Sequence, residues 1–172
     1  EPANTSCKAW KVRLPLLHRV RTTFVCRIPV ENWNDALSPW EAPAVWGKQG
    51  FGGKAADTLR FLMEQVIPTL KRQFRLPEDI KIILGGYSLA GLFALWASTQ
   101  ANLFCGIAAA SPSVWFPGWM EFEQQHPMQA QRVYLSLGDK EEHTKNTVMA
   151  VVGDNIPHSA QPTYRAWRRL RP

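Results

Sequence analysis

The sequence of 172 residues predicts an α/β fold with a mostly parallel sheet. Two observations support this: short apolar, β-prone runs alternate with runs of helical spacing, and small or polar residues follow the ends of the predicted strands. Parallel sheets are covered by helices on both faces, so we expect three layers. The length suits one domain with a sizeable core, and residues 1–172 are predicted to form it.

The predicted strands are β-branched or apolar and end at turn residues. They lie at 22–30, 80–84, 105–110 and 132–137. The apolar spacing predicts a helix over 54–74, with a bend at Pro68. A second helix is expected over 89–99, a short helix or loop over 118–125, and 146–155 is a further candidate helix. Residues 31–53 form a long irregular stretch rich in Trp, Pro and Gly. Loops of this length are usually functional, and we expect this one to shape a substrate pocket.

Composition excludes several classes of function. The net charge of +6 comes from the two ends of the chain, because residues 28–164 hold ten basic and thirteen acidic side chains. We therefore expect no nucleic-acid partner. No apolar run approaches the roughly 20 residues of a membrane span, so no membrane association is predicted. The first residues lack the pattern of a signal peptide, and the three cysteines lack a C-x-x-C motif. These features predict reduced thiols in a cytoplasmic protein.

The strand predicted at 80–84 runs into a small-residue turn around Ser88, and a helix follows. This strand–turn–helix pattern is typical of a nucleophilic serine, because the turn exposes Oγ at the carboxyl end of a strand. Gly86 and Ala90 supply the small neighbours that such a turn needs, in the form G-x-S-x-A with Gly91 next. We predict Ser88 as nucleophile and the Leu89 N–H as an oxyanion donor.

A serine hydrolase also needs an acid, a base and a second oxyanion donor. Glu141 and Asp139 both follow the predicted strand 132–137, and we favour Glu141 as the acid. The second donor is expected in the loop after strand 22–30, at Trp33 or Asn34. Tyr87, next to the nucleophile, is assigned with them to the oxyanion and substrate-binding residues. Ser111 also follows a strand end, that of 105–110.

The base is open at this stage. In this type of site the histidine follows the acid in the chain. His158 has the right order but lies 17 residues after Glu141, and His143 lies two residues after it. His18 and His126 precede the acid and are predicted to be surface residues. His158 is our first candidate and His143 the second.

No cofactor or metal is predicted. The Gly-rich segment 50–54 lacks the pattern of a phosphate-binding loop, which would need Gly at Lys48 and Ser or Thr at Ala55. No H-x-x-x-H or similar metal-binding cluster occurs.

The segment 86–95, Gly-Tyr-Ser-Leu-Ala-Gly-Leu-Phe-Ala-Leu, resembles the nucleophile segment of the putative esterase family of α/β-hydrolases, which includes esterase D-like and enterochelin esterase-like proteins. Three further regions resemble small bacterial members of that family, namely 32–40, 50–53 and 136–146. The resemblance covers about residues 22–156, whereas 1–21 and 157–172 are atypical.

The resemblance implies an α/β-hydrolase-type sandwich, a Ser–acid–His triad without cofactor, and hydrolysis of small-molecule carboxylic esters through an acyl-enzyme. It places the acid in the turn 138–141. The family's histidine lies in a segment similar to Gly-Asn-His-Phe, which this sequence lacks. Two hypotheses follow: a serine-dependent carboxylic-ester hydrolase, or a truncated, non-catalytic remnant that binds a ligand or partner through the same cleft.

Overall fold

The computed structural model describes residues 8–12, 23–45, 47–138, 141–143, 145–151, 155 and 165–170. The chain divides into two compact units, Glu1–Glu31 and Asn32–Pro172, which are described separately. In the first unit, β1 (Lys8–Val12) pairs antiparallel with β2 (Thr23–Arg27). The strand predicted at 22–30 is thus confirmed over its centre.

The cysteines differ from the sequence-based expectation. Cys26 on β2 is disulfide-bonded, whereas Cys105 is a half-buried free thiol. The prediction of reduced thiols is therefore wrong for Cys26. The antiparallel pairing of β1 and β2 brings Cys26 close to a part of the chain that is distant in sequence, which the spacing of the cysteines does not reveal. The cytoplasmic location stays a prediction. Within the described residues, no helix combines the length and the apolar character required to span a bilayer.

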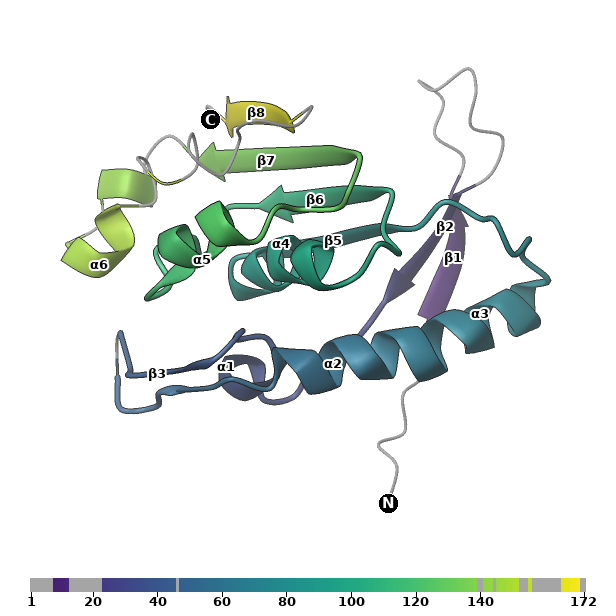
Figure 1. Cartoon of the computed structure of the whole chain (residues 1–172), viewed down its shortest axis with the longest axis horizontal. Helices are drawn as coiled ribbons and strands as arrows, with labels where there is room; N and C mark the ends of the chain where they lie inside the picture. Colours follow the sequence, from purple (N-terminus) through teal and green to yellow (C-terminus); the bar gives the residue numbers. More distant parts are fainter. Residues whose placement is uncertain are drawn as a thin grey trace. The chain divides into compact units, whose positions relative to one another are not determined.

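The second unit is built around a four-stranded parallel sheet (Figure 1). Its strands lie side by side in chain order: β5 (Ile83–Tyr87), β6 (Gly106–Ala110), β7 (Arg132–Gly138) and β8 (Arg165–Leu170). Because all four strands run in one direction, their carboxyl ends meet at one edge of the sheet. The predicted α/β fold with a mostly parallel sheet is confirmed.

The helix predicted over 54–74 is present as three consecutive segments, α2 (Ala55–Phe61), a π-helical turn (Leu62–Val66) and α3 (Ile67–Phe74). Pro68 is the second residue of α3 and has no N–H to donate to the carbonyl four residues earlier. The wide turn immediately before it accommodates this loss. Two shorter helices are α5 (Trp119–Gln125) and α6 (Thr147–Ala150); α6 covers only the first part of the predicted 146–155.

Helix α4 (Leu89–Gln100) is the centre of the core. It packs on β5 and β6 and also contacts α1 (Trp33–Ala36) and α2, so residues 91–98 are all buried. Leu92 and Leu95 are fully inaccessible. The sheet face under α4 is equally apolar, and Ala109 and Leu135, which lie beside each other in register, are both 0% exposed. Burial on this scale is the main stabilising term of the unit.

Alternate residues of a strand point to opposite faces, and the other face of the sheet is more accessible. Ile83 and Tyr87 on β5 are 67% and 63% exposed, and Tyr134 on β7 is 39% exposed. The position of β5 also departs from the prediction at 80–84. Pairing with β6 starts at Ile83 and continues through the two glycines to Tyr87, so the partner strand rather than the apolar run sets the register.

Two features were not predicted. Strand β8 lies in the Arg-rich C-terminal sequence, where the charge hides any strand pattern, and it pairs with β7 over Val133 to Gly138. Short elements also occur within the predicted loop 31–53: α1 and the antiparallel pair β3 (Glu41–Ala42) and β4 (Phe51–Gly52).

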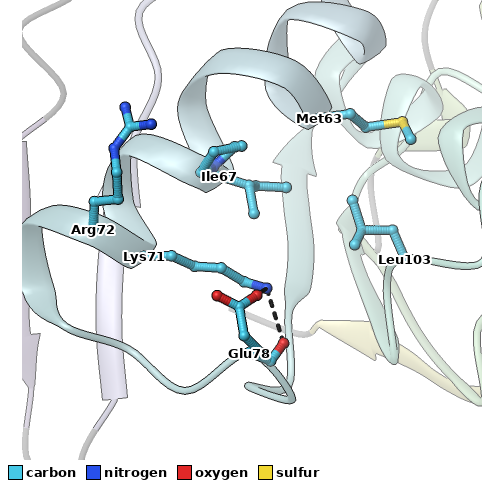
Figure 2. Close-up of a pocket in the computed structure, with 7 residues that line it drawn as sticks. Met63, Ile67, Lys71, Arg72, Glu78 and Leu103 are labelled. Carbon is cyan, nitrogen blue, oxygen red and sulfur yellow. Dashed lines mark hydrogen bonds and ion pairs between the residues drawn. The ribbon is translucent and has the colours of Figure 1, made fainter.

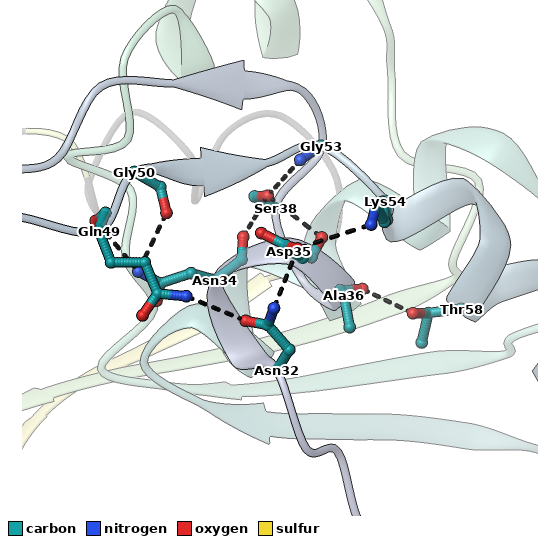
Figure 3. A network of polar contacts seen from close by, with 10 residues as sticks. All are labelled: Asn32, Asn34, Asp35, Ala36, Ser38, Gln49, Gly50, Gly53, Lys54 and Thr58. Carbon is teal, nitrogen blue, oxygen red and sulfur yellow. Dashed lines mark hydrogen bonds and ion pairs between the residues drawn. The ribbon is translucent and has the colours of Figure 1, made fainter. Parts of the chain in front are cut away.

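A polar network holds this part of the chain in place (Figure 3). The fully buried Ser38 hydroxyl donates to the Asn34 carbonyl at 2.6 Å and accepts from the Gly53 N–H at 2.8 Å. Thr58 on α2 donates to the Ala36 carbonyl at 2.6 Å. These bonds satisfy main-chain groups that no sheet or helix pairs, so the stretch is an ordered structure rather than an open loop.

The packing of α4 on β5 predicts that Gly86 tolerates no side chain. A Cβ at this position would overlap the carbonyl oxygen of Ala90 in the first turn of α4. We expect Gly86→Ala to lower the free energy of unfolding by about 1–3 kcal/mol or more, measured by urea denaturation. The matched control is Gly106→Ala, whose Cβ would meet nothing closer than 3.4 Å. Equal losses for the two variants would contradict this account.

Candidate active site

Ser88 lies between the last residue of β5 and the first of α4 with φ 55° and ψ −121°. A residue with a side chain adopts such a conformation only when its surroundings enforce it. Here the Ser88 N–H donates to the Ala110 carbonyl at 3.0 Å, and the Ser88 carbonyl accepts from the Leu92 and Ser113 N–H groups, both at 3.1 Å. The main chain of Ser88 is thereby fixed to α4 and to the end of β6.

Small residues permit this arrangement. Gly86 and Ala90 face each other across the turn, and Gly91 lies against the chain that follows β6. A Cβ at Gly91 would come within 3.1 Å of Pro112 Cα. The sequence pattern predicted the need for small neighbours at Gly86 and Ala90, and the structure adds the reason for Gly91, which is the close approach of Pro112.

Ser113 and the start of α4 lie beside Ser88. The Ser88 Oγ is 3.2 Å from the Oγ of Ser113, a residue that is only 1% exposed. Leu89 is the first residue of α4, so its N–H belongs to the helix turn whose N–H groups have no partner inside the helix. The positive end of the helix dipole therefore lies at Ser88, where negative charge is stabilised.

Glu141 is joined to the same region. Its Oε1 accepts a hydrogen bond from Ser111 Oγ at 2.6 Å and from the Gly138 N–H at 3.2 Å. Ser111, Pro112 and Ser113 form what we call the 111–113 loop, which follows β6. One end of this loop contacts Glu141 after β7 and the other contacts Ser88 after β5, so three adjacent strand ends converge here.

The other predicted residues of the oxyanion and substrate set have defined places. Tyr87 is the last residue of β5, and Trp33 is the first residue of α1 and is 55% exposed. The Asn34 side-chain amide donates to the Gly50 carbonyl at 3.2 Å, which commits it to the network of Figure 3. Contact of these three side chains with a substrate stays a prediction.

The structure describes two of the four histidines, His143 and His126. His143 is exposed in a 3-10 turn over Glu141–His143, directly after the predicted acid. His126 is exposed at the end of α5, stacked on Phe122 at 4.1 Å between ring centroids, in agreement with its assignment as a surface residue. Asp139, His158 and His18 lie outside the described residues. The base therefore stays a prediction.

Most aromatic residues of the stretch 31–53 that the structure describes serve packing. Phe51 lies 5.0 Å from Phe116 between ring centroids and is 5% exposed. Trp40 contacts Phe116 and Phe122, and its Nε1 donates to the Pro117 carbonyl at 2.9 Å. This cluster holds the chain immediately after the 111–113 loop. Trp33, by contrast, is accessible.

A separate open cavity of about 380 Å³ lies between α3 and the turns before β5 and β6 (Figure 2). Lys71 reaches into it and is paired with the Glu78 carboxylate at 2.9 Å. Glu78 precedes β5 and Leu103 precedes β6, so the cavity is at the amino edge of the parallel sheet, opposite to Ser88. In the part of the chain that the structure describes, no three His, Cys, Asp or Glu side chains are grouped to hold a metal ion.

A parallel sheet whose strand β5 leads through Ser88 into a buried helix is an α/β arrangement. The chain belongs to the family described as Putative esterase, whose profile matches residues 3–167. The resemblance seen in the sequence is thereby confirmed. Among curated proteins, none matches the chain significantly.

Solved structures with a similar fold include the following three. Siderophore hydrolase EstA from Aspergillus nidulans has a TM-score of 0.66 and 20% identity over 87% of this chain and 65% of its own. BES protein from Bacillus cereus has a TM-score of 0.61 and 19% identity over 87% and 62%. The enterobactin esterase FES from Shigella flexneri has a TM-score of 0.56 and 19% identity over 67% and 33%. The chain thus spans less than two thirds of the length of these proteins.

The backbone conformation of Ser88 predicts an unusual order of stability. Glycine tolerates φ 55°, so we expect Ser88→Gly to be more stable than Ser88→Ala. The difference should be about 1 kcal/mol, because relief of strain exceeds the entropy that glycine adds to the unfolded chain. Ser98, in the interior of α4, is the matched control, and there the alanine variant should be more stable by about 0.5–1 kcal/mol. The same order at both positions in urea denaturation would contradict a strained Ser88.

Proposed function

We propose that this chain is a carboxylic-ester hydrolase with Ser88 as its nucleophile. The observation that carries the proposal is the enforced conformation of Ser88 at the head of α4, with φ 55° and its main chain hydrogen-bonded on both sides. Strained residues cluster at functional sites, and this strain brings Oγ and the first N–H groups of a helix together. Membership of the Putative esterase family supports the same reaction class.

In the proposed reaction Ser88 Oγ attacks the ester carbonyl while a histidine takes its proton. The oxyanion is stabilised by the Leu89 N–H and by a second donor at Trp33 or Asn34. Collapse of this intermediate breaks the bond to the alcohol, which leaves with the proton from the histidine. Water then attacks the acyl-enzyme with the histidine as base, the carboxylic acid is released, and Ser88 regains its proton.

We propose Glu141 as the acid, in preference to Asp139. Two hydrogen bonds to Oε1 orient its carboxylate, and a carboxylate has a second oxygen that can accept the N–H of an imidazole. We propose His158 as the base, with His143 as the alternative. Each assignment can be tested with one substitution.

The proposed substrate is a small ester. Trp33 and Tyr87 are exposed aromatic side chains close in sequence to the proposed oxyanion donors, and such side chains bind aryl or acyl groups. Two of the similar structures bear the names siderophore hydrolase and enterobactin esterase. Siderophore esters are therefore the first natural substrates to test beside simple p-nitrophenyl esters.

The test is hydrolysis of p-nitrophenyl butyrate by the purified chain. We expect Ser88→Ala to reduce kcat by at least about a thousandfold, because members of a triad act as a unit. Glu141→Gln and one of His158→Asn and His143→Asn should also lose most of the activity. The control is His126→Gln, which changes an exposed histidine stacked on α5 and should leave kcat unchanged.

Activity that survives Ser88→Ala would contradict the proposal. A folded native chain without any ester hydrolysis would instead favour the non-catalytic binding domain, which titration with the same esters or with siderophores would then examine.

A further inference from the structure

We infer that Ser111 is a positioning residue that orients the Glu141 carboxylate for the reaction. This inference rests on the proposed function, because it gives Glu141 the role of the acid. Three independent observations support it: the hydrogen bond between the two side chains, the backbone conformation of Ser111, and the contacts of the 111–113 loop with Ser88.

The hydrogen bond has a defined direction and length. An ionised carboxylate only accepts, so Ser111 Oγ is the donor. At 2.6 Å the distance is in the range of charge-assisted O–H···O bonds. The Gly138 N–H donates to the same oxygen, so both bonds fix Oε1 and set the direction of the other carboxylate oxygen. That oxygen is the one left for an imidazole N–H.

The backbone conformation of Ser111 favours glycine, so the presence of a serine side chain there suggests a role for its hydroxyl. Its φ of 42° is in the left-handed region, where glycine fits without strain and most other residues do not. The Ser111 N–H donates to the Ser136 carbonyl at 2.7 Å and holds this conformation. If the position served the backbone alone, glycine would be the better residue. Compared with glycine, serine adds a CH2OH group, and its hydroxyl contacts Glu141.

The 111–113 loop is rigidly held at its other end. Ser113 donates its N–H to the Ser88 carbonyl, and Pro112 lies against Gly91 of α4. Val114 and Phe116, which follow, are 0% and 2% exposed. A donor mounted on this loop therefore has a fixed position relative to Ser88. The hydrogen bond from Ser111 thereby fixes the exposed Glu141 carboxylate, which without Ser111 would keep only the bond from the Gly138 N–H.

The decisive comparison is between Ser111→Gly and Ser111→Asn. Glycine removes the hydroxyl and the strain together, so its melting temperature should equal or exceed that of the native chain. Its kcat on p-nitrophenyl butyrate should fall by about tenfold to a hundredfold with little change in KM, since the acid is misplaced while binding is not. Asparagine tolerates positive φ and carries an N–H donor, so it should recover part of kcat.

A double substitution shows whether Ser111 acts through Glu141. We expect Ser111→Gly to have no further effect on kcat in the Glu141→Gln background. A Ser111→Gly chain with native kcat, an asparagine variant with no recovery, or multiplying losses in the double variant would each overturn the inference. If native turnover depends on Ser88 but not on Ser111, only this inference fails. If Ser88→Ala has no effect, the proposed function fails as well and the inference falls with it.

Discussion

The close packing of α4 on the ends of β5 and β6 is the constraint on which the rest of the structure depends. Gly86 meets the carbonyl of Ala90 with no room for a side chain, and Gly91 lies tightly against Pro112. The buried apolar residues of α4 hold the helix there, and the strain at Ser88 is the consequence. Hydrophobic burial across the unit therefore stabilises one unfavourable local conformation at the position where chemistry is proposed.

The parallel sheet also brings together the segments that follow its strands. Because β5, β6 and β7 end at the same edge, their following segments can contact one another in order. The 111–113 loop is the middle of the three and touches both Ser88 and Glu141. The aromatic cluster of Trp40, Phe51 and Phe116 fixes the chain that follows this loop, so Trp40 and Phe51 of the stretch 31–53 support this region through packing.

The sequence predicted the elements whose structure depends mainly on the residues within them. The small residues around Ser88, the apolar run of α4 and the strand before Glu141 each carry a clear pattern, and the structure confirms these elements. Long-range pairing decides the rest. The start of β5 depends on β6, and β8 is recognisable only by its partner β7. The contact of Ser111 with Glu141 joins residues 30 apart, which no periodicity indicates.

The central claim is that Ser88 is chemically activated, and covalent labelling tests it most directly. The chain and its Ser88→Ala variant would be treated with a fluorophosphonate and their intact masses compared. We expect one phosphonyl group per native chain and none on the variant, because only a serine with a nearby base and oxyanion donors reacts quickly. An unlabelled native chain that is fully folded, or equal labelling of both chains, would contradict it.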